Sequence, residues 1–151
     1  MPTTLRMRNI LTYEDVLFNF RQSEAIIIIG DNQDDPGQKG NGSGKSGLNE
    51  GTVLALTGTP MRDVSNRDII RRGTDSGEVE LTLTTGTVEI KIWRKFYVGS
   101  KSSEYRMWKN GKECKDLYSD ANSFNDFVFT TLTAYVEFTP YLYFYRTCSE
   151  R

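Results

Sequence analysis

Six consecutive residues carry the chemical groups of a phosphate-binding loop. They are Asn41, Gly42, Ser43, Gly44, Lys45 and Ser46. Glycines allow the backbone to wrap closely, so that several N–H groups can point at phosphate oxygens. In such a loop the lysine, here Lys45, contacts the β- and γ-phosphates and serves catalysis, and the Ser46 hydroxyl ligates Mg²⁺. The complete pattern has a glycine where Lys39 stands, and Gly40 follows one place later. The loop predicts a site for a nucleotide and Mg²⁺.

The residues on either side of this loop predict the elements that position it. Four isoleucines, residues 26–29, indicate a strand buried on both faces. An apolar stripe that begins at Leu48 predicts a helix over residues 46–56. Strand, glycine-rich loop and helix in this order are typical of a P-loop, whereas Gly-Lys-Ser in a surface turn is the alternative. The helix contains Gly47 and Gly51, each about 1 kcal/mol less favourable than alanine, so we expect it to depend on tertiary packing.

The chain before the loop predicts a β-rich start. Alternating side chains indicate a first strand over residues 3–13, a polar turn at Glu14 and Asp15, and a second strand over residues 16–20. Residues 33–40 have turn composition and no apolar anchor. They predict a tolerated loop insertion, with a lid over the nucleotide or a partner contact as the alternative.

The chain after the helix changes to a period of two residues. Residues 79–83 and 88–94 alternate and predict a β-hairpin, and Asn110–Gly111 predicts a second hairpin turn. Residues 122–136 carry an apolar face with helical spacing. Trp93 and Trp108 are expected to pack in the core or across strands.

Two groups of basic residues follow the predicted helix. Arg67, Arg71 and Arg72 lie within residues 63–72, which predict a short helix or an ordered loop. We expect them on a solvated face, with phosphate contacts as the alternative. The hairpin region carries further cations that are expected to project from an ordinary sheet surface, namely Lys91, Arg94, Lys95 and Arg106.

Length and composition limit the remaining possibilities. A chain of 151 residues fits one domain, and its net charge of −1 contains no long block of like charge. Two distant cysteines, Cys114 and Cys148, and the absence of histidine indicate neither a zinc site nor a disulfide framework. No apolar run is long enough for a membrane helix. We therefore expect a cytoplasmic protein with a single α/β domain over residues 1–151 and no membrane partner.

Several segments together resemble the N-terminal head of SbcC-type recombination ATPases. They are residues 5–13, residues 26–30, the Asn41–Ser46 loop with Leu48 and Glu50, and residues 68–73. These ATPases are relatives of the SMC proteins with ABC-type heads, and some phages encode them. The resemblance covers residues 5–132 and leaves residues 133–151 as an unplaced tail. It implies a P-loop NTPase lobe of the ABC-ATPase head type, with a mixed sheet and an antiparallel β subdomain.

The same resemblance implies a site and partners. Arg8 and Asn9 would lie near ATP, the residues from Asn41 to Gly47 would hold its phosphates, and Ser46 would ligate Mg²⁺. In the family two heads enclose two nucleotides, and their closure controls a partner nuclease of the SbcD type and, indirectly, access to DNA ends. The function implied is ATP binding by one half of a DNA-repair ATPase head.

Other parts of such a head have no counterpart in the sequence. No strand ends in Asp-Glu, and no heptad repeat for a coiled coil is present. A complete ATPase would therefore need a C-terminal lobe, and whether the chain itself is an enzyme stays open. The alternative function is a truncated binding or regulatory protein that acts on a partner ATPase or nuclease without hydrolysis. A small P-loop kinase is a third possibility, weakened by the lack of a recognisable acceptor-activating aspartate or lid arginines.

Overall fold

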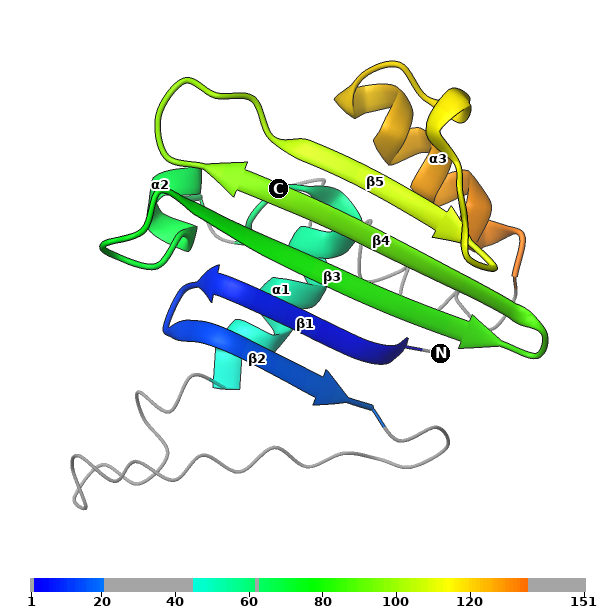
Figure 1. Ribbon diagram of the computed structural model, residues 1–151, viewed down its shortest axis with the longest axis horizontal. Coiled ribbons are helices and arrows are strands. Elements are labelled where there is room, and N and C mark those ends of the chain that lie inside the picture. The colour runs from blue at the N-terminus through cyan, green and yellow to red at the C-terminus, as the bar shows by residue number, and fades with distance from the viewer. Residues whose placement is uncertain (1, 21–44, 62, 136–151) are drawn as a thin grey trace.

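A computed structural model describes residues 2–20, 45–61 and 63–135 of the protein (Figure 1). Its centre is one six-stranded sheet with the order β2-β1-β3-β4-β5-β6, in which every neighbouring pair is antiparallel. The strands are β1 (Pro2–Ile10), β2 (Tyr13–Asn19), β3 (Ser76–Thr85), β4 (Val88–Tyr97), β5 (Glu104–Lys109) and β6 (Lys112–Glu113). The described strands thus form an antiparallel sheet, whereas the sequence predicts a mixed one. The predicted strand at residues 26–29 and the loop insertion at residues 33–40 lie outside the described residues.

The two long helices of the described residues lie on one face of this sheet (Figure 1). Helix α1 (Lys45–Thr57) crosses behind β1, β3 and β4, and α3 (Ala121–Thr133) packs against β5 and α1. Two short elements complete the fold, α2 (Asn66–Ile69) and the 3-10 helix η2 (Lys115–Leu117). None of these helices has the length and apolar character needed to cross a membrane.

The core forms between the sheet and the two long helices. Leu5, Leu81, Ile92 and Met107 stand side by side on four successive strands, and all four are fully buried. From the helix side, α3 contributes Phe124, Val128 and Leu132. The β-hairpin predicted from the period of two residues is therefore confirmed. Alternate side chains of its strands face the helices, and the others form an open face.

The turn between β1 and β2 is a correction to the sequence prediction. The chain reverses at Leu11 and Thr12, and both Glu14 and Asp15 belong to β2. Leu11 has a φ of 52°, and its N–H donates to the carbonyl of Ile69 at 2.7 Å. A tertiary hydrogen bond thus holds this turn, and the adjacent residues have no turn composition that predicts it.

Helix α3 begins one residue earlier and ends earlier than predicted. Asp120 caps its start: the Ser123 N–H donates to Asp120 Oδ1 at 2.8 Å, and the Asp120 N–H donates to Ser123 Oγ at 3.0 Å. This reciprocal pair satisfies two N–H groups that the helix itself cannot. Residues 136–151, the larger part of the predicted tail, lie outside the described residues.

Arg94 is the second correction, because it is buried and not part of a basic surface. Only 4% of it is exposed, and it lies on the helix-facing side of β4 between Ile92 and Phe96. The cations predicted beside it do lie on the open face. There Lys91 stands 4.7 Å from the ring centroid of Trp108, so the predicted cross-strand packing of this tryptophan is confirmed.

Candidate nucleotide-binding site

The start of α1 is the element that could hold phosphate. Helix α1 begins at Lys45, directly after residues 41–44 of the predicted loop, which lie outside the described residues. Ser46 stands exposed in the first turn, and that turn contains no acidic residue. The N-terminus of a helix of this length offers unpaired N–H groups and a partial positive charge to an anion. Lys45 and Ser46 thus occupy the helix start, as the P-loop motif requires.

Two glycines let α1 lie directly on the first two strands. A Cβ atom at Gly47 would stand 2.8 Å from Tyr13 Cε2 and 3.4 Å from Leu11 Cδ1. At Gly51 it would collide with Met7 Sδ. Burial also raises the pKa of the Tyr13 hydroxyl above its ordinary value of 10.0. Both glycines lower the stability of the helix, but they allow α1 to lie closer to β1 and β2 than larger residues would.

The end of β1 is held by the segment that follows α2. Asn9 has a φ of 51°, and its carbonyl accepts the N–H of Arg71 at 2.9 Å. Ile10 and Ile70 form an isolated antiparallel bridge, and both are buried. Because Leu11 also touches the Gly47 region of α1, residues 9–11 lie between the helix start and residues 69–71.

A pocket of about 370 Å³ opens at this junction. Its lining consists of Leu11, Thr12, Asp68, Ile70, Arg71 and Arg72. Hydrogen bonds from the Ser65 hydroxyl and N–H lower the pKa of Asp68, with smaller effects of Arg67 and Arg72, so this carboxyl is anionic at neutral pH. Arg67 and Arg72 are exposed, as the predicted solvated face requires, and Arg71 and Arg72 line the open pocket, where Arg71 donates to Glu14 Oε2 at 3.0 Å. The buried pair Ile69–Ile70 immediately before them was the signal that their backbone is anchored.

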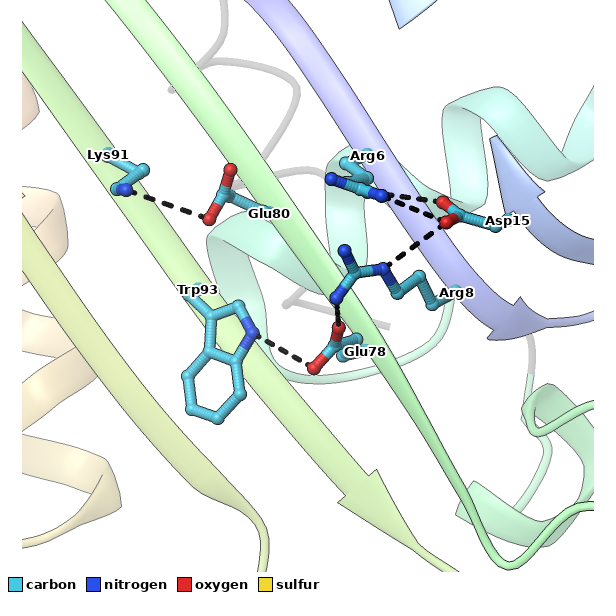
Figure 2. Close-up of polar contacts among 7 residues, drawn as sticks. All are labelled: Arg6, Arg8, Asp15, Glu78, Glu80, Lys91 and Trp93. Carbon is cyan, nitrogen blue, oxygen red and sulfur yellow. Dashed lines mark hydrogen bonds and ion pairs between the residues drawn. The ribbon is translucent and has the colours of Figure 1, made fainter. Parts of the chain in front are cut away.

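Arg8 lies on the opposite, open face of the sheet (Figure 2). Its guanidinium contacts Glu78 Oε1 at 2.5 Å and Asp15 Oδ2 at 3.4 Å. Glu78 also accepts the indole N–H of Trp93 at 3.3 Å. The described contacts of Arg8 are therefore with carboxylates of β2 and β3, and a role of Arg8 or Asn9 at a nucleotide stays a prediction.

Asp15 joins two arginines in this open-face network. Arg6 donates to both of its carboxylate oxygens, at 3.1 and 2.9 Å, and Arg8 approaches the second oxygen (Figure 2). The hydrogen bond from Arg6 is the main reason that the pKa of Asp15 is lowered and that of Arg6 is raised. Both side chains are solvent-exposed, so the network is screened by salt and orders the face more than it stabilises the fold.

Ser46 is the one protein ligand that the sequence predicts for a metal ion at the helix start. Within the described residues no three His, Cys, Asp or Glu side chains gather into a metal-binding group. A P-loop serine needs no such group, because nucleotide phosphates and water supply the other ligands of Mg²⁺. The exposed Ser46 at the start of α1 fits this arrangement.

Comparison with known proteins supports the architecture. No protein-family model and no curated protein sequence matches the chain. The fold is similar to that of the recombination mediator protein RecF of the RecFOR pathway. The RecF-ATPrS structure matches with a TM-score of 0.53 and 17% identity, and the RecF-ATP structure with 0.50 and 16%. Each match covers 76% of this chain and 28% of the RecF chain.

This likeness concerns the fold. At such identities it shows that 76% of this chain has a fold similar to part of RecF, which supports the coarse fold prediction. The chain spans less than a third of the RecF chains that it matches. The predicted likeness to the SbcC type in particular stays a proposal.

Proposed function

We propose that this chain binds Mg-ATP as the N-terminal lobe of a DNA-repair ATPase head. The observation that carries the proposal is the position of Lys45 and Ser46 at the start of a helix that glycines seat on an antiparallel sheet. The solved RecF structures, one with ATP and one with ATPrS, share this fold and support a nucleotide as the ligand.

The site would use three sets of groups. Residues 41–44 and the first N–H groups of α1 surround the phosphates, Lys45 meets the β- and γ-phosphates, and Ser46 ligates Mg²⁺. The pocket lined by Leu11, Thr12, Asp68, Ile70, Arg71 and Arg72 shares Leu11 with the Gly47 contact of α1, and it would receive the nucleoside end of ATP. Arg71 and Arg72 there carry positive charge, which Asp68 and the Glu14 carboxylate paired with Arg71 offset in part.

The partners follow from the same proposal. A C-terminal lobe or a second head would complete the ATPase. Closure of the heads on ATP would then control an SbcD-like nuclease and, indirectly, access to DNA. The absence of a strand ending in Asp-Glu keeps a second function open, that of a nucleotide-binding regulatory protein without turnover. Both functions require ATP binding, so binding is the property to test first.

Titration calorimetry with Mg-ATP tests the proposal. We expect saturable binding by the wild type and at least a tenfold weaker affinity in Lys45→Ala, because a charge-assisted contact to phosphate is lost. Lys112→Ala is the matched control, since Lys112 is an exposed lysine on β6, at the other edge of the sheet from β2. Equal affinity of the wild type and Lys45→Ala would place the nucleotide elsewhere, and no binding by the wild type would remove the proposed function.

A further inference from the structure

The C-terminal end of α1 is held by a side chain from another element. The last four carbonyls of a helix have no partner within it, and α1 has no basic residue in its last turn. The Gly58 N–H satisfies the Leu54 carbonyl at 2.9 Å. Arg94 of β4 satisfies the next two: its Nε donates to Ala55 O at 2.8 Å, and its Nη2 donates to Leu56 O at 2.9 Å.

The same guanidinium reaches the other long helix. Arg94 Nη2 donates to Asn125 Oδ1 of α3 at 2.8 Å, and Arg94 Cζ lies 4.7 Å from the ring centroid of Phe124. The positive charge is buried, and the negative end of α1 and the amide oxygen of Asn125 contribute to its compensation. One side chain thus joins the sheet, the end of α1 and the start of α3.

The chain is shaped to admit this guanidinium. Gly58 has a φ of 73°, a conformation that favours glycine, and a Cβ there would lie 2.7 Å from Arg94 Nη1. A pocket of about 530 Å³, lined in part by Gly58, Arg94 and Asn125, opens beside the contact. Water from this pocket can reach the α1 carbonyls when the arginine is replaced, so substitution at position 94 need not unfold the domain.

We propose that Arg94 is a positioning residue of the nucleotide site and couples that site to α3. The inference rests on the proposed function. Helix α1 is about 20 Å long and connects the Arg94 contact at its last turn to Lys45 and Ser46 at its first turn, so a change at one end alters the position of the other. Gly47 and Gly51 lower its intrinsic helix stability, so the contacts at its ends contribute more to its position. Nucleotide binding at the start of α1 therefore restricts α3 through Arg94 and Asn125.

The test measures ATP affinity and amide hydrogen exchange in four variants of the full chain, at a temperature at which circular dichroism shows each to be folded. Arg94→Met should weaken Mg-ATP binding about tenfold, and Arg94→Lys should recover only part of it, because lysine keeps the charge but not the planar fork. Mg-ATP should slow exchange in α3 of the wild type, and Asn125→Ala should lose this effect while its affinity changes less than threefold. Arg106→Met, an exposed arginine of the open face, is the control and should behave as the wild type.

The outcomes separate a positioning role from a purely structural one. A structural role lowers the melting temperature of the Arg94 variants but leaves the ATP affinity of the folded protein unchanged, and that result would overturn the inference. If Mg-ATP slows amide exchange in α3 of Asn125→Ala as much as in the wild type, the coupling is overturned. This measurement can be made even if Arg94→Met does not fold. Absence of ATP binding by the wild type would reject the proposed function and this inference together.

Discussion

The sulfur atom of Met7 lies against the backbone of Gly51, so that α1 has no room for a methyl group at this position. Leu5 Cδ2 stands 3.3 Å from the position that a Cβ atom of residue 51 would take. Both Met7 and Leu5 are fully buried. The sheet and the helix of the proposed site therefore approach closely at a glycine that costs helix stability. Its presence inside α1 is explained by packing.

We predict that Gly51→Ala destabilises the protein in spite of the better helix propensity of alanine. Overpacking a buried site costs about 1–3 kcal/mol, whereas the gain in propensity is about 1 kcal/mol. Thermal unfolding should show a melting temperature lower by a few degrees. Asn49→Ala, at an exposed position of the same helix, should raise the melting temperature slightly.

A second substitution makes this prediction specific to the Met7 contact. Met7→Val shortens the side chain that meets position 51, so in that background Gly51→Ala should be neutral or stabilising. The coupling between the two substitutions should then reach about 0.5–3 kcal/mol. Independent effects of the two substitutions would show that the clash is relieved by movement elsewhere.

Local patterns in the sequence predicted the elements whose structure is set by neighbouring residues. The β3–β4 hairpin follows from strict alternation, and the Asn110–Gly111 turn follows from two residues that tolerate the positive φ values of 48° and 76° found there. The start of α1 follows from the motif. In the two hairpins the pattern that sets the turn lies within a short stretch of the chain.

The features that the sequence did not predict depend on distant groups. The turn at Leu11 is held by Ile69, and the burial of Arg94 is compensated by carbonyls of α1 nearly forty residues away in sequence. The alternation of Ile90, Ile92 and Phe96 places position 94 on the buried face, whereas the sequence prediction had Arg94 point outward. At a helix end that lacks its own basic residue, an arginine in phase with a buried stripe is a candidate cap.

The open-face network provides a second prediction, which compares two neighbouring glutamates of β3. Glu78 accepts from both Arg8 and Trp93 and is partly buried, whereas Glu80 contacts Lys91 at 3.8 Å. Glu78→Ala should lower the free energy of unfolding by about 1 kcal/mol, and Glu80→Ala by less than about 0.5 kcal/mol. Urea unfolding measures both. Equal effects would mean that the contacts of Glu78 contribute no more than a surface ion pair.

The cap of α3 predicts a pH dependence. Hydrogen bonds from the Ser123 N–H and hydroxyl are the main cause that lowers the pKa of Asp120 below its ordinary value of 3.8. A carboxyl with a lowered pKa in the folded state stabilises it above the unfolded pKa, and this contribution is lost as the pH falls through the folded pKa. The melting temperature of the wild type should therefore decrease below about pH 4.

Asp120→Asn isolates this contribution, because asparagine is also a good N-cap and does not titrate. The two proteins should have similar melting temperatures at neutral pH, and the decrease on acidification should be smaller in Asp120→Asn. Asp15, Asp68 and Glu104 also have lowered pKa values, and they affect both proteins alike. Parallel pH profiles of the two proteins would show that the cap does not contribute to acid sensitivity.

Hydrolysis is the final prediction, and it distinguishes the proposed ATPase lobe from a complete enzyme. Hydrolysis requires a group that positions the attacking water as well as stabilisation of the charge on the γ-phosphate. Lys45 and Ser46 can contribute to the second requirement. No strand of the sequence ends in the Asp-Glu pair that would meet the first. We therefore expect the chain alone to bind Mg-ATP and to release phosphate no faster than Lys45→Ala.

Phosphate release from the purified chain with Mg-ATP measures this, and Lys45→Ala corrects for contaminating ATPases. A complementing C-terminal lobe should raise the rate of the wild type and leave Lys45→Ala inactive, because the lobe supplies the carboxylate but not the phosphate contact. Steady turnover by the wild-type chain alone, lost in Lys45→Ala, would show that a carboxylate of this chain positions the water. Asp68 in the pocket beside Leu11, and Glu14, which pairs with the pocket residue Arg71, would then be the first residues to replace.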